Sequence, residues 1–139
     1  MVLRKIVICY DGSEFASRAV DFVISHIATS DTELHLVFVG VAKLSGMNLD
    51  TNMLKSIREN GELVLNQEYK NIAERFKKVT LKYVEGTDIA DAILEYSKLT
   101  GANLIVAGSR GISVWAGALL GSVSQRLLVK SPVPVLLIK

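Results

Sequence analysis

The chain has 139 residues, of which 50% are hydrophobic and 22% charged, with a formal net charge of +2 and a single cysteine. This composition excludes a disordered chain, and the scattered basic residues argue against nucleic-acid binding. No apolar run approaches the roughly 18 residues of a membrane span, no signal peptide is recognisable, and a lone Cys9 fits a reducing cytosol. We therefore expect a soluble, cytoplasmic protein with one domain over residues 1–139.

The first apolar run, residues 4–10 (RKIVICY), is short and β-branched, which predicts a strand buried on both faces. Ser13 is a natural N-cap for a helix that runs to about Ala28 and carries one apolar stripe. A second strand is predicted over residues 33–39, and residues 40–49 have the composition of a loop.

A long helix with a polar stripe is predicted from about residue 50 to 76, followed by a third strand over residues 79–84. Either Thr87 or Asp88 caps a short helix after this strand. Gly101 ends that helix.

Residues 104–107 (LIVA) predict a fourth strand, residues 121–130 a last helix, and residues 133–138 (VPVLLI) a fifth strand. Strands that alternate with helices indicate βαβ units with right-handed crossovers. The expected fold class is α/β, a doubly wound five-stranded parallel sheet with helices on both faces. It is a Rossmann-like, three-layer α/β/α architecture.

Unusual residues gather where the predicted strands end, which is the edge at which open α/β sheets bind ligands. Asp11 follows the first strand, and the segment VAGSRGISVWAGALLGSVSQ (residues 106–125) follows from the fourth. Gly108 and Gly111 let the chain turn sharply and offer backbone N–H groups to an anion. Gly121 opens the last helix, whose N-terminus suits phosphate. These features favour a phosphate site over glycines that serve helix–strand packing only.

Two other phosphate-binding motifs are absent from the sequence. No Gly-Lys-Ser or Gly-Lys-Thr triplet exists, which excludes a P-loop. Residues 11–15 (DGSEF), after the first strand, do not supply the G-x-G-x-x-G fingerprint of a dinucleotide site.

The spacing of Gly108 and Gly111, followed after nine residues by Gly121-Ser122, resembles the G-2x-G-9x-G-[S/T] motif of the nucleotide-binding universal stress proteins. The resemblance covers the whole chain through the segments IVICYDGSE, VEGTDIADAI, ANLIVAGSRG and SPVPVLLIK. It implies the doubly wound fold, ATP as the ligand with Mg or Mn as candidate metals, and a homodimer through the last strand.

The resemblance also implies which residues hold the nucleotide. The ribose- and phosphate-contacting set, with the turn beside it, comprises Gly108, Ser109, Arg110, Gly111, Gly121, Ser122, Val123 and Ser124. Asp11 resembles the acidic residue near the ribose and any metal, and the backbone of Val39 resembles the group that holds the adenine edge. Cys9 stands where many members have a different small residue, often proline. Trp115 either covers the ligand or packs on a partner.

The remaining polar candidates have simpler interpretations. His26 and His35 lack metal-ligand spacing, so we expect surface or core roles for them. Cys9 alternates with apolar neighbours in a predicted buried strand, so we expect a packing thiol rather than a nucleophile. Asn103, where an aspartate is common in the family, reads as structural.

The favoured function is an ATP-binding regulatory protein of the universal stress type, a nucleotide-dependent switch in a stress response or in signalling. It would act through an unidentified protein partner and would have no catalytic residues. Phosphoryl transfer needs positioned metal ligands and an oriented nucleophile, and only Asp11 offers a carboxylate near the phosphates. A slow ATPase or nucleotidyl-transfer enzyme using Asp11 and a divalent metal is the alternative.

Overall fold

The computed structural model describes residues 3–44, 47–109 and 121–139. The sheet strands are β1 (Lys5–Cys9), β2 (Glu33–Val41), β5 (Val79–Gly86), β6 (Leu104–Gly108) and β7 (Val135–Ile138). The helices are α1 (Glu14–His26), α2 (Thr51–Ile72), α3 (Ile89–Thr100) and α4 (Ser122–Lys130). Two further short strands, β3 (Lys43–Leu44) and β4 (Met47–Asn48), pair with each other.

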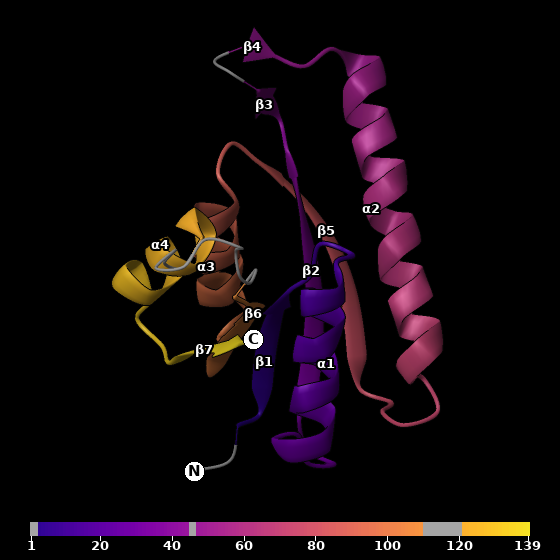
Figure 1. Ribbon diagram of the computed structural model, residues 1–139, viewed down its shortest axis with the longest axis vertical. Helices are drawn as coiled ribbons and strands as arrows, with labels where there is room; N and C mark the ends of the chain where they lie inside the picture. The colour runs from indigo at the N-terminus through magenta and orange to yellow at the C-terminus, as the bar shows by residue number, and fades with distance from the viewer. Residues whose placement is uncertain (1–2, 45–46, 110–120) are drawn as a thin grey trace.

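The main sheet is parallel throughout and has the strand order β5-β2-β1-β6-β7, with β1 in the centre (Figure 1). β1 pairs with β2 on one side and β6 on the other, so strand order reverses between β1 and β6. That reversal opens a crevice at the carboxyl ends of these strands, where ligands of such sheets bind.

Helices cover both faces of the sheet because each buried strand alternates its side chains between two cores. Ile6 and Ile8 of β1 pack with α1 and α2, whereas Val7 of the same strand packs with α3 and α4. The four sheet-facing residues of α1 are Ala16, Ala19, Val20 and Val23. This arrangement confirms the doubly wound, three-layer α/β/α fold that the sequence predicts.

The predicted helix caps are also present. The Ser13 side chain accepts a hydrogen bond from the Ala16 N–H at 3.2 Å, and the Asp88 carboxylate accepts one from the Asp91 N–H at 2.9 Å. Of the two candidate caps for α3, Asp88 is therefore the one used. Gly101 ends α3 with a φ of 73°, a left-handed conformation that glycine adopts without strain.

The prediction of a loop over residues 40–49 was wrong. β2 continues through Gly40 to Val41, which pairs with Gly86, and the segment after it forms the β3–β4 hairpin. Gly40 does not end the strand. A Cβ atom there would lie 1.8 Å from the Tyr83 Oη, so glycine makes room for a tyrosine of the neighbouring strand.

Two smaller outcomes concern the ends of elements. α2 ends at Ile72, before the predicted residue 76, because the N–H groups of Arg75 and Phe76 both donate to the Ile72 carbonyl in a closing turn. Asn103 has the structural role expected of it, since its Oδ1 accepts hydrogen bonds from the N–H groups of Arg4 (3.0 Å) and Lys5 (2.8 Å).

Within the described residues, no helix is long and apolar enough to cross a membrane.

Candidate functional site

A cavity of about 280 Å³ lies at the carboxyl end of β1 and β6, at the crevice between them. Its described lining consists of Cys9, Asp11, Ser13, Phe15, Ala16, Ile89, Ala107, Gly108, Gly121, Ser122, Val123 and Ser124. The volume is close to the lower limit of small-molecule sites, ~300 Å³. We call this cavity the strand-end pocket.

The β1 side of the pocket is shaped by a tight turn. The Asp11 Oδ1 accepts a hydrogen bond from the Ser13 N–H at 2.9 Å, and Gly12 between them has a φ of 84°. This turn directs the exposed Asp11 carboxylate to the edge of the pocket and starts α1 immediately beyond it. Asp11 is the one charged residue in the described lining.

The β6 side depends on the absence of a side chain at Gly108. A Cβ atom there would lie 2.8 Å from the Phe15 Cβ and 3.1 Å from its carbonyl oxygen. Glycine thus lets the end of β6 approach the first turn of α1 closely enough for both to line one cavity.

The opposite wall is the beginning of α4. Gly121 is its N-cap and has an extended backbone, and no side chain of the described residues caps the helix. The first N–H groups of a helix have no acceptor within it and carry a partial positive charge. Residues 122–124 therefore present hydrogen-bond donors at the pocket, which suits an anion such as phosphate.

Ser124 is the polar residue most deeply set in this wall. It is only 4% exposed and lines the pocket, and its hydroxyl makes no hydrogen bond to a residue that the structure describes. A serine that is nearly buried and lines a cavity can direct its hydroxyl toward what the cavity holds. A polar ligand in the pocket would supply a hydrogen-bond partner.

Six of the predicted site residues line the pocket together, namely Asp11, Gly108, Gly121, Ser122, Val123 and Ser124. Val39 is not in the lining. It lies at the carboxyl end of β2, paired with Val84, and contacts the core on the α3–α4 face. Ser109 is also outside the lining, and its backbone N–H donates to the Ile138 carbonyl at 2.8 Å, so that donor is not offered to a ligand. Arg110, Gly111 and Trp115 lie outside the described residues.

Sequence reasoning did not identify Ser13, Phe15, Ala16, Ile89 and Ala107, which also line the pocket. Most of them come from the first turns of α1 and α3, the elements that directly follow strand ends. Their position beside a predicted strand end could have indicated that they line the pocket. Their residue types could not, because these are not typical ligand-binding side chains.

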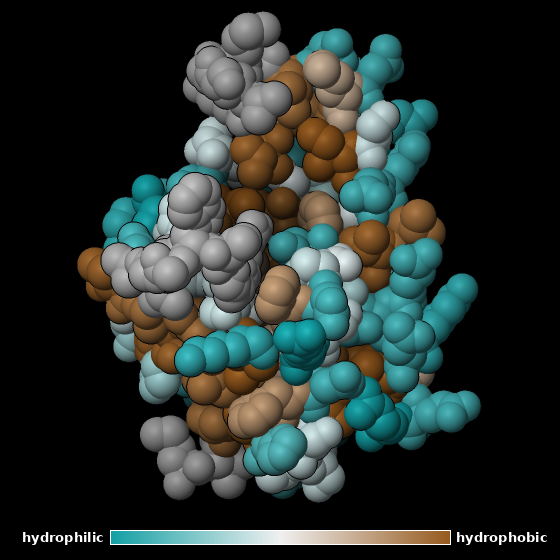
Figure 2. All heavy atoms as spheres, viewed as in Figure 1, coloured by the Kyte–Doolittle hydropathy of each residue, from teal (hydrophilic) through white to brown (hydrophobic). Residues whose placement is uncertain are grey.

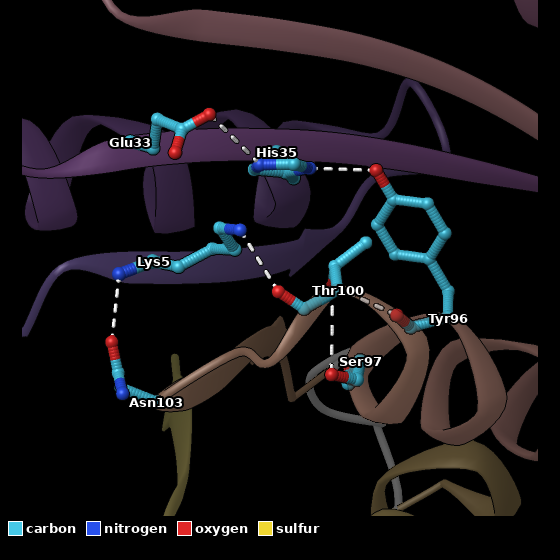
Figure 3. A network of polar contacts seen from close by, with 7 residues as sticks. All are labelled: Lys5, Glu33, His35, Tyr96, Ser97, Thr100 and Asn103. Carbon is cyan, nitrogen blue, oxygen red and sulfur yellow. Dashed lines mark hydrogen bonds and ion pairs between the residues drawn. The ribbon is translucent and has the colours of Figure 1, made fainter.

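A polar network around His35 lies away from the pocket, toward the amino-terminal end of the sheet (Figure 3). His35 Nδ1 lies 2.6 Å from the Tyr96 hydroxyl, and Nε2 lies 3.5 Å from the Glu33 carboxylate. Burial lowers the pKa of His35, partly offset by the Glu33 charge. His35 is buried and bonded to Tyr96, which agrees with the core role expected of it. The described residues contain no cluster of three or more metal-ligating side chains.

Comparison with known proteins identifies the relatives of this chain. The sequence model of the universal stress protein family matches residues 3–139. The chain is 31% identical to the universal stress protein MJ0531 of Methanocaldococcus jannaschii over 143 residues, which covers 98% of this chain and 82% of that protein.

Two solved structures share the fold and contain adenine nucleotides. One is a universal stress protein in complex with cAMP, with a TM-score of 0.76, 24% identity, and coverage of 99% of this chain and 98% of that chain. The other is the universal stress protein from Archaeoglobus fulgidus in complex with dAMP, with a TM-score of 0.72, 20% identity and full coverage of both chains. At these identities the likeness concerns the fold.

Proposed function

Because this chain belongs to the universal stress protein family, we propose that it is an ATP-binding regulatory protein that holds its nucleotide in the strand-end pocket. The state of the nucleotide would act as a switch in a stress response or in signalling, read by a protein partner. The proposed setting is the cytoplasm, because a chain with the single cysteine Cys9 fits a reducing compartment.

The observation that carries this proposal is the donor set at the beginning of α4. The N-terminus of α4 has no cap from a described side chain, and Ser124 is 4% exposed with no side-chain hydrogen bond to another described residue. Both line one cavity. Helix N-termini of this kind bind phosphate through N–H groups and the helix dipole. The lining also includes apolar groups such as Phe15 and Ile89, which suit a sugar or a base.

The proposed assignment of groups follows this geometry. Phosphate and ribose oxygens would meet Gly108 and the segment from Gly121 to Ser124, with Ser109, Arg110 and Gly111 in the adjoining turn. Asp11 would face the ribose or a metal ion, and the Val39 backbone would hold the adenine edge. Structures of the same fold that contain cAMP and dAMP support an adenine nucleotide as the ligand class.

Calorimetric titration of nucleotide-free protein with Mg-ATP tests the proposal. We expect saturable binding with one nucleotide per chain, and competition by other adenine nucleotides would define which of them is preferred. Absence of any heat of binding at millimolar nucleotide would exclude the proposed function.

A slow ATPase is a second candidate, because Asp11 is the one carboxylate in the described lining of the pocket. Mg²⁺ in nucleotide sites is held by one or two carboxylates together with phosphate oxygens, and Asp11 fits that requirement. The ion would neutralise phosphate charge, and Asp11 would orient it. ATP turnover that disappears in Asp11→Ala supports this activity, whereas intact ATP after long incubation with the purified protein rules it out.

We also propose that the protein is a homodimer that pairs through β7. Among the described strands, β7 pairs with β6 alone and leaves its other edge open. Apolar side chains gather over α4 and β7 in Figure 2, and Leu128 and Val129 of α4 are 45% and 83% exposed. An open edge strand beside exposed apolar residues is typical of a surface that pairs with another chain.

A further inference from the structure

Cys9 lies inside the strand-end pocket. It is the last residue of β1. Its side chain and that of Ile8 lie on opposite faces of the sheet, so Cys9 packs with Val7 on the α3–α4 face. It is partly exposed, whereas Ile6, Val7 and Ile8 before it in the strand are fully buried. Its side chain is therefore buried by the core on one side and borders the cavity on the other.

The same cavity carries an independent sign of a ligand. Ser124 is 4% exposed, lines the pocket and finds no hydrogen-bond partner for its hydroxyl among the described residues. Asp11, Cys9 and Ser124 belong to the lining of one cavity of about 280 Å³, so a ligand that fills this cavity lies close to Cys9. A group added to the Cys9 sulfur would occupy the space of that ligand.

Two helix N-termini, which stabilise a thiolate, and the Asp11 carboxylate, which opposes one, border the same pocket. The nucleophile in thiol chemistry is the thiolate, which is stabilised by helix N-termini. The first turns of α1 and α4 both line this pocket, through Phe15 and Ala16 in one helix and Ser122 and Val123 in the other. Their dipoles direct partial positive charge toward the cavity that Cys9 borders.

We propose that Cys9 is a modification site for small disulfides and that its modification closes the pocket to nucleotide. The Cys9 thiol gives its proton to solvent, and the thiolate attacks one sulfur of the disulfide. A new S–S bond forms to Cys9 while the S–S bond of the reagent breaks, and the released thiolate takes up a proton. Cys9 is oxidised and the reagent reduced. The closing of the pocket rests on the proposed function, whereas the modification itself does not.

Incubation of the folded, nucleotide-free protein with 2-hydroxyethyl disulfide tests the modification, with intact mass spectrometry as the readout. We expect one mixed disulfide per chain, which dithiothreitol removes, and at least a tenfold slower reaction in saturating Mg-ATP. The adduct should bind Mg-ATP at least tenfold more weakly than the unmodified protein. Cys9→Ser should form no adduct, and treatment with the disulfide should leave the Mg-ATP affinity of that variant at its untreated value.

A matched control places the thiol elsewhere. Ser30 is exposed in the turn before β2, at the opposite end of the sheet from the pocket. In the double variant Cys9→Ala/Ser30→Cys, Mg-ATP should not slow the reaction, and the adduct should bind nucleotide like the unmodified variant.

Two results would overturn the inference, and a third would contradict the proposed function while it leaves the modification site standing. If the folded protein resists a reagent that labels the urea-unfolded chain, Cys9 is not a modification site. If the adduct binds Mg-ATP normally, the modification does not close the pocket. If the unmodified protein binds no nucleotide but still forms the adduct, the proposed function fails while the modification site stands.

Discussion

Gly108 and Gly121 belong to the same sequence motif but are glycines for different physical reasons. At Gly108 a side chain would collide with Phe15 of α1, so glycine there allows two elements to pack. At Gly121 an added Cβ atom meets nothing within 4 Å among the described residues, so it would extend into open space at the pocket. The first glycine supports the fold, and the second keeps room for a ligand.

Gly121→Val should therefore abolish nucleotide binding and leave the fold intact. The valine side chain would occupy the space where we propose the phosphate lies, and its backbone φ of −62° suits any residue. We expect affinity for Mg-ATP to fall at least ~10-fold, a loss of about 1.4 kcal/mol, in a protein that still folds and unfolds cooperatively. Gly108→Ala is the contrasting variant, since its clash should lower the melting temperature. Normal Mg-ATP affinity in Gly121→Val would contradict the proposed site.

His35 should make stability depend on pH in the mildly acidic range. Burial lowers its pKa, outweighing the opposing effect of Glu33, while Lys5 acts in the same direction as burial. The folded state thus binds fewer protons than the unfolded state below the unfolded pKa of about 6.5. Above the unfolded pKa, the contribution of neutral His35 to the free energy of unfolding should be fully present. This free energy should fall as the pH drops from the unfolded pKa to the lower pKa of the folded state.

Urea unfolding of His35→Gln between about pH 7 and pH 5 checks this expectation, because glutamine does not titrate and can still bond Tyr96. The variant should show a smaller loss of stability on acidification than the natural chain. His26→Gln is the control, since His26 is the other histidine of the chain and is exposed. A pH dependence that His26→Gln removes and His35→Gln leaves unchanged would contradict the assignment.

The sequence predicts much of the pocket but not its exact lining. Motif spacing indicates Gly108 and Gly121–Ser124 because their roles depend on the backbone and on glycine, which a sequence displays directly. It cannot indicate Phe15 or Ile89, since these are ordinary apolar residues whose role comes from the convergence of three helix starts. The tertiary hydrogen bond from the Ser109 N–H to β7 is equally invisible in the sequence.

At the level of elements, α2 contains a glycine that helix propensity alone would predict to be unfavourable but that packing requires. Gly61 lies in the middle of α2, where alanine would normally be more stable by about 1 kcal/mol. A Cβ atom at Gly61 would lie 2.7 Å from the Phe38 ring and 2.8 Å from the Tyr83 ring. These rings stack on each other with centroids 5.8 Å apart, so neither can withdraw freely. α2 thus needs glycine to approach β2 and β5.

Gly61→Ala should consequently destabilise the protein, because an overpacked contact costs ~1–3 kcal/mol and exceeds the gain in helix propensity. We expect the free energy of unfolding to fall by about 1 kcal/mol in urea denaturation. Asn60→Ala is the matched control at the exposed neighbouring position, and it should be neutral or slightly stabilising. A stabilised Gly61→Ala would mean that α2 packs less closely than described.

The elements themselves show why sequence patterns succeed in some places and fail in others. Short β-branched runs such as residues 4–10 identify the central strands, because burial on both faces leaves no polar position. The prediction failed at Gly40 because a glycine usually marks a turn. Here the missing side chain instead makes room for Tyr83 of the neighbouring strand β5. The β3–β4 hairpin has only two residues in each strand, which is too few to show an alternating pattern.

At the scale of the whole molecule, the proposed dimer depends on the backbone of β7. The Ile105 N–H donates to the Pro134 carbonyl and the Ser109 N–H to the Ile138 carbonyl, so the even-numbered residues of this strand face β6. In a parallel pair the odd-numbered residues, Val135 and Leu137, then direct their N–H groups outward. A partner strand would need those donors.

Leu137→Pro should give a monomer, because it removes one outward N–H group at an edge position that tolerates proline. Leu137→Ala keeps the N–H group while it shortens the side chain, and should remain dimeric. Sedimentation velocity over a range of concentrations distinguishes the two states. A Leu137→Pro protein that still sediments as a dimer would exclude pairing through this edge.

The strand-end pocket is assembled from segments that are far apart in the chain. Cys9 to Ala16 come first in the chain, Ile89 begins α3, Gly108 ends β6, and Gly121 to Ser124 form the start of α4. During synthesis, which proceeds from the N-terminus, the wall formed by α4 is made after the rest of the described lining. A nascent chain that has not yet reached α4 therefore lacks one wall of the pocket, and the nucleotide that we propose can bind only after that helix has been made.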